Sequence, residues 1–185
     1  MSHIVELKEM IPPSFAPFRR LVEEPNTGEV ASLHCCVPHF DVSPALLREA
    51  VFKAINDDDF REEVNNIEKR TSSSRYWRPN NTRTFDPVRL DSELVTVSIF
   101  ELMANLCHMA TNEVIRDAGA DVQSRVEIAM TLFNEIVSGR YGDFYVDVAR
   151  FGWLGSHTVP LCSTWFVYDA VQKELWLLMY NNWNF

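Results

Sequence analysis

The spacing of apolar residues changes near Gly142, and this change limits the folds that the chain can adopt. Before Gly142, apolar side chains recur every three or four residues, as on one face of a helix. This spacing predicts central helices over about residues 44–69, 92–118 and 122–138. Beyond Gly142 apolar and polar residues alternate, which is typical of strands. Helices in the middle of a chain and strands at its end favour an α+β fold.

The strands are predicted to form a C-terminal antiparallel sheet over about residues 143–180, on which the helices pack. Its clearest part is a hairpin, because Thr164–Tyr168 and Leu175–Tyr180 are rich in aromatic and β-branched residues and a short polar turn joins them. The run Leu175–Tyr180 is apolar on both faces, so we expect it to be central in the sheet or covered by a partner. Upstream, Val30–Val37 is expected to form another short strand.

The predicted helix ends rest on residues that commonly cap helices. Asp91 or Ser92 is expected to begin the helix over 92–118. Asp121 can cap the next helix, and Gly139 can end it.

The length of 185 residues fits a single α+β domain over residues 1–185. Residues 1–28 contain four prolines and are predicted to form an irregular N-terminal arm. Residues 69–89 lack helical or strand periodicity and are predicted to form a long loop.

This loop, which we term the arginine tract, is the strongest indication of function. It carries six cations and one anion, so its local charge of +5 leaves −14 for the rest of a chain whose net charge is −9. Guanidinium groups bind carboxylates and phosphates, and aromatic rings add stacking. The tract predicts binding to an acidic protein surface or to nucleic acid, unless it pairs with the chain's own carboxylates. The predicted contact residues are Arg70, Arg75, Tyr76, Trp77, Arg78, Arg83 and Arg89.

The cysteines and glycines indicate no bound metal or cofactor. The four cysteines show no paired C-x2-C spacing of the kind that structural zinc sites use. The six glycines form no phosphate-binding pattern. We therefore expect no cofactor. Cys35 and Cys36 are adjacent and poorly placed to bond each other, so we expect reduced thiols.

A thiol enzyme is the alternative to a binding protein. The order Cys36, His157, Asp169 resembles that of papain-like cysteine hydrolases, and Asn181-Asn182-Trp183 resembles their asparagine–tryptophan pair. The resemblance implies a Cys36 thiolate nucleophile, His157 as the base and Asp169 as the group that orients the base.

The remaining features concern location and assembly. No apolar run approaches the roughly 18–20 residues that cross a bilayer, and the first residues do not resemble a secretion signal. We expect a soluble, cytoplasmic protein that acts by binding, as an assembly or regulatory component. Tryptophans crowd the last third of the chain, either as core residues or as a surface for a homo-oligomer.

Overall fold

The computed structural model describes residues 6–8, 13–23, 28–36, 49, 57, 94–111, 121–150 and 163–182. These residues form a six-stranded antiparallel sheet in the order β1-β2-β6-β5-β4-β3. The strands are β1 (Glu6–Lys8), β2 (Gly28–Cys36), β3 (Leu94–Val97), β4 (Phe144–Arg150), β5 (Ser163–Asp169) and β6 (Glu174–Asn182). The helices are α1 (Phe15–Glu23), α4 (Ile99–Thr111) and α5 (Val122–Val137), with a short 3₁₀ turn, η1 (Tyr141–Asp143), before β4.

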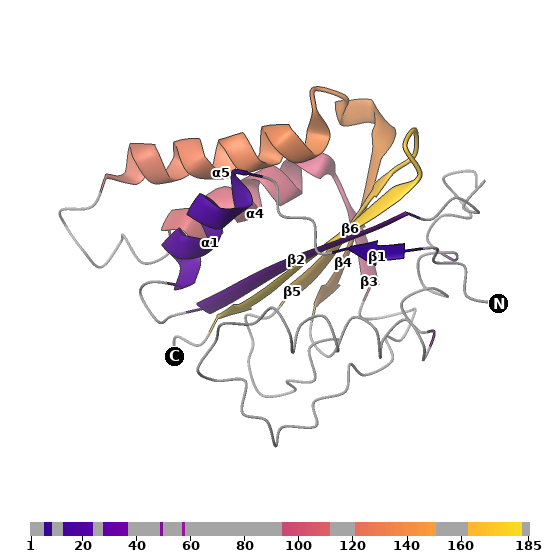
Figure 1. Cartoon of the computed structure of the whole chain (residues 1–185), viewed down its shortest axis with the longest axis horizontal. Helices are drawn as coiled ribbons and strands as arrows, with labels where there is room; N and C mark the ends of the chain where they lie inside the picture. Colours follow the sequence, from indigo (N-terminus) through magenta and orange to yellow (C-terminus); the bar gives the residue numbers. More distant parts are fainter. Residues whose placement is uncertain are drawn as a thin grey trace, which may run out of the picture.

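The three helices lie together on one face of the sheet, which confirms the predicted α+β class (Figure 1). Their buried side chains meet a row of sheet residues in which Val167 of β5 pairs with Val146 of β4 and Trp176 of β6. On the opposite face, the paired residues Phe166 and Leu177 are also buried. Residues of β5 and β6 are thus buried on both faces, and β6 lies between β2 and β5, as the run Leu175–Tyr180 predicted.

Several predicted elements are confirmed closely. Helix α5 ends at Val137, and the Asp121 carboxylate accepts a hydrogen bond from the Ser124 N–H at 3.2 Å, as expected of an N-cap. The predicted hairpin is β5 and β6, and the strand expected at Val30–Val37 is β2. Of the helical region predicted over 44–69, the structure describes Glu49, which is helical, and Asp57; the rest lies outside the described residues.

The helix predicted over 92–118 is wrong at its start. Residues 94–97 form strand β3, and α4 begins only at Ile99. The valines of Leu94–Val97 favour a strand. Val95 is two residues from Val97, the spacing of one face of a strand, and four residues from Ile99, the spacing of one face of a helix. Ser98 and Glu101 mark the true start, because the Glu101 carboxylate accepts the Ser98 N–H at 3.5 Å as in a capping box.

The N-terminal arm predicted over residues 1–28 is not irregular where it is described. It contains β1 and the helix α1, whose Phe15, Phe18 and Val22 are buried in the core. Pro17 is compatible with this helix because it lies in the first turn, where a backbone N–H has no partner within the helix. The first i to i−4 hydrogen bond runs from the Phe18 N–H to the Ser14 carbonyl, at 3.2 Å.

Candidate functional site

Most of the site residues predicted from the sequence lie outside the described residues. This holds for His157 and for the arginine tract, with Arg70, Arg75, Tyr76, Trp77, Arg78, Arg83 and Arg89. The structure places two predicted residues, Cys36 and Asp169, together with the polar groups around Asp169.

Cys36 and Asp169 lie in one row across the sheet. Cys36 ends β2 and pairs with Glu174 of β6, which pairs in turn with Asp169 of β5. Two strand spacings separate Cys36 from Asp169, or about 10 Å between backbones. Cys36 belongs to a strand that pairs on both sides, since Glu6 of β1 lies opposite it.

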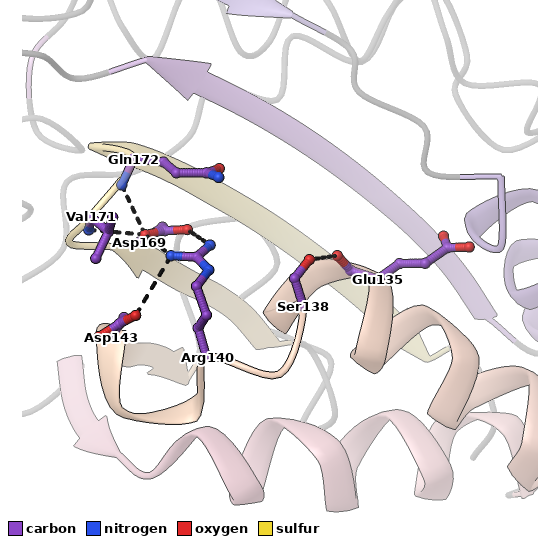
Figure 2. Close-up of polar contacts among 7 residues, drawn as sticks. All are labelled: Glu135, Ser138, Arg140, Asp143, Asp169, Val171 and Gln172. Atoms are coloured by element: carbon purple, nitrogen blue, oxygen red, sulfur yellow. Dashed lines mark hydrogen bonds and ion pairs between the residues drawn. The ribbon is translucent and has the colours of Figure 1, made fainter.

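The carboxylate of Asp169 is buried and accepts four hydrogen bonds (Figure 2). Arg140 approaches end-on, with Nη1 donating to Oδ1 at 3.0 Å and Nη2 donating to Oδ2. The backbone N–H groups of Val171 and Gln172 donate to Oδ1 at 2.9 and 3.0 Å. Three of these donors thus share Oδ1 and one reaches Oδ2, so both carboxylate oxygens are hydrogen-bonded.

Local backbone structure brings Arg140 to this position. After α5 the chain reverses through Ser138 and Gly139, which both have positive φ angles, of 50° and 76°. The Arg140 N–H bonds to the Val137 carbonyl at 3.0 Å, and its carbonyl accepts the Asp143 N–H at 3.0 Å. The guanidinium carbon also lies 5.3 Å from the centre of the Phe144 ring. The side chain is therefore held from several directions.

The same contacts join two turns that are distant in the sequence. The Asp143 carbonyl accepts the Ala170 N–H at 2.9 Å, and the Asp143 carboxylate lies 3.7 Å from Arg140 Nη1. The turn between α5 and β4 is thereby bonded to the turn between β5 and β6.

The pair of Arg140 and Asp169 is ionised at neutral pH. Burial alone would raise the pKa of Asp169, but the hydrogen bonds from Arg140 and from the Gln172 and Val171 N–H groups, together with the Arg140 charge, lower it. The hydrogen bond to Asp169 raises the pKa of Arg140. General acids and bases work best with pKa values near the operating pH, so this carboxylate has the properties of a structural group. Both of its oxygens are also already engaged, Oδ1 by three donors and Oδ2 by one.

The structure also describes the side chain of Cys107 and several acidic groups. Cys107 of α4 is partly buried, and this burial raises the pKa of its thiol, which opposes thiolate formation. Within the described ranges, no group of three or more His, Cys, Asp and Glu side chains is placed to hold a metal ion.

The structure also shows an exposed aromatic cluster that the sequence analysis missed. Phe100 of α4 and Tyr141 of η1 stack with ring centres 5.6 Å apart and an angle of 24° between planes. Both are exposed, and we term this pair the aromatic corner. The two residues are 41 positions apart in the sequence, so no local pattern could have joined them.

Comparisons with known proteins identify no relative by sequence. No family model matches the chain, and no curated protein matches it. Two solved structures of citrus MAF1 resemble it weakly, at TM-scores of 0.40 and 0.41 with 9% and 10% identity. The alignments cover 89% and 92% of this chain and 94% and 99% of the citrus chains. Scores this low assign neither a shared fold nor a function. Among the described helices, none is both long and apolar enough to span a bilayer.

Proposed function

We propose that the chain acts by binding a partner through its arginine tract and not by catalysis. The observation that carries this proposal is the segregation of charge, with +5 in residues 69–89 of a chain whose net charge is −9. The partner is an acidic protein surface or a nucleic acid, because guanidinium groups bind both carboxylates and phosphates in a fork geometry.

The contacts of Asp169 support binding over the papain-like alternative. That alternative requires a carboxylate that orients a histidine, and Asp169 instead holds Arg140 and the two N–H groups of its own turn. A probe with a thiol-reactive electrophile near neutral pH tests the alternative directly. Labelling at Cys36 that depends on His157 would restore it.

The binding proposal is tested by reversing charge in the tract. We expect the triple variant Arg75→Glu, Arg78→Glu, Arg83→Glu to lose at least about 90% of partner capture from a host-cell extract, since each reversal replaces an attraction with a repulsion. If the tract is a binding surface that faces solvent, the thermal midpoint should stay within about 2 °C of the wild type, since surface changes rarely alter stability by more than about 0.5 kcal/mol. Arg20→Glu is the matched control, because Arg20 is exposed on α1.

The two partner classes differ in their response to nuclease and salt. Capture that nuclease treatment abolishes, and that falls steeply with salt, indicates nucleic acid. Capture that survives nuclease indicates an acidic protein. If the triple variant unfolds, or captures the partner as the wild type does, the tract is not the binding surface.

A further inference from the structure

The aromatic corner is the outer end of a three-ring stack that begins in the core. Phe133 of α5 is 1% exposed, and its ring centre lies 6.1 Å from that of Tyr141, with 24° between planes. Tyr141 is 42% exposed and stacks in turn on Phe100, which is 54% exposed. The stack therefore leads from buried to exposed rings across three separate elements, α5, η1 and α4.

Such a pair is unusual among the exposed apolar residues. The described part of the chain has five exposed large apolar residues, and Phe100 and Tyr141 are the two aromatic ones. Single exposed apolar residues are normal on protein surfaces and need no explanation. Two exposed rings in contact form a continuous apolar surface, and aromatic residues of this kind anchor interfaces.

The surrounding backbone holds the corner in place before any partner arrives. Tyr141 belongs to η1, whose Asp143 N–H bonds to the Arg140 carbonyl and whose Asp143 carbonyl accepts the Ala170 N–H. Phe100 lies in the first turn of α4, which the contact between Ser98 and Glu101 begins. Groups already fixed in position lose little conformational entropy on binding.

The charged groups near the corner are mostly acidic. Glu101 follows Phe100 and is exposed, while Asp143 lies two residues after Tyr141 with its side chain 41% exposed. The hairpin turn adds Glu174 and Lys173, and Arg140 is directed toward the buried Asp169. Among these six described residues, four are carboxylates and two are cations, which sum to −2. Aromatic faces attract cations, and carboxylates add to that attraction.

We propose that the aromatic corner is a docking site for a basic segment of a partner protein. An arginine or lysine side chain of that segment stacks on the exposed ring of Phe100, and Glu101 and Asp143 attract the neighbouring cations. This proposal involves other residues than the arginine tract and a partner of the opposite charge, so it does not depend on the function proposed above.

The test uses the full chain and a fluorescently labelled hexa-arginine peptide, followed by fluorescence anisotropy near physiological salt. We expect the double variant Phe100→Ala, Tyr141→Ala to bind the peptide about tenfold more weakly, since exposed contacts between cations and rings are each of modest strength. Val122→Ala is the matched control, because Val122 is 49% exposed but begins α5, at the helix end opposite η1. This control should bind as the wild type does.

Two further variants separate stacking from general attraction to an acidic protein. Phe100→Leu keeps an apolar side chain without a π face, and Glu101→Gln keeps the capping contact without the charge. Both should weaken hexa-arginine binding by about two- to fivefold. Wild-type affinity in Phe100→Leu, or equal binding of a hexaglutamate peptide, would overturn the proposal. The triple tract variant should still bind hexa-arginine, so failure of one proposal leaves the other open to its own test.

Discussion

The pair of Arg140 and Asp169 and the aromatic corner lie at the same end of the sheet but use their side chains in opposite ways. Asp169 is buried and has hydrogen-bond donors on both carboxylate oxygens. Phe100 and Tyr141 are stacked but remain open to solvent. Both regions meet at η1, which follows Arg140 and contains Tyr141.

The difference separates residues that maintain the fold from residues available to a partner. A buried carboxylate that already accepts four hydrogen bonds is satisfied without a ligand, and its loss leaves other groups unpaired. An exposed ring pair loses little when it is removed from the isolated protein, and it can gain from being covered. Substitution of Asp169 should therefore mainly lower the stability of the protein, whereas substitution of Phe100 or Tyr141 should mainly weaken partner binding.

The largest effect is expected for Asp169→Ala. This change leaves the Arg140 guanidinium and the N–H groups of Val171 and Gln172 without their acceptor, and we expect the free energy of unfolding to fall by about 3 kcal/mol. Urea unfolding at pH 7 measures this. Asp169→Asn is the control, since it keeps an acceptor oxygen for the turn and should lose less. A fall below about 0.5 kcal/mol for Asp169→Ala would contradict a structural role.

A smaller effect is expected from pH. The folded-state pKa of Asp169 lies below its ordinary value of 3.8, so its contribution to stability is present above that value and is lost as pH falls through the folded pKa. Urea unfolding of the wild type and Asp169→Asn from pH 7 to pH 2 should show a constant difference above about pH 5. The difference should shrink below about pH 4. A constant difference down to pH 2 would show that the charge of Asp169 contributes nothing.

The smallest effect on stability is expected for Phe100→Ala. The ring is more than half exposed, so its removal should change the free energy of unfolding by only about 0.5 kcal/mol. The same variant should weaken hexa-arginine binding. Phe100→Ala is thus expected to affect binding more than stability, whereas the main effect expected of Asp169→Ala is on stability. If Phe100→Ala destabilises the protein by more than about 2 kcal/mol, the ring belongs to the core and the comparison fails.

The sequence predicted elements whose signals are local. The hairpin of β5 and β6, the cap at Asp121 and the central position of β6 all follow from residues close together in the chain. The start of α4 was missed because Val95 fits two periodicities. Ser98 and Glu101 were the overlooked signal, since their spacing is that of a capping box.

The site residues seen in the structure had weaker signals or none. Arg140 meets Asp169 across 29 residues and Phe100 meets Tyr141 across 41, and no periodicity links such pairs. The sequence order Cys36, His157, Asp169 predicted a catalytic role for Asp169 in the papain-like alternative. Its structural role depends on donors from the turn that follows it and from Arg140.

The strand order has a consequence for how the protein is made on the ribosome. β2 pairs with β1 on one side and with β6 on the other, and its partner residues in β6 are 174–182. While synthesis proceeds from the N-terminus, β2 lacks its larger neighbour until those residues have emerged. Pairings between distant segments form slowly, and an unpaired strand edge invites association with other chains. We therefore expect one edge of β2 to be open to aggregation until β6 joins the sheet.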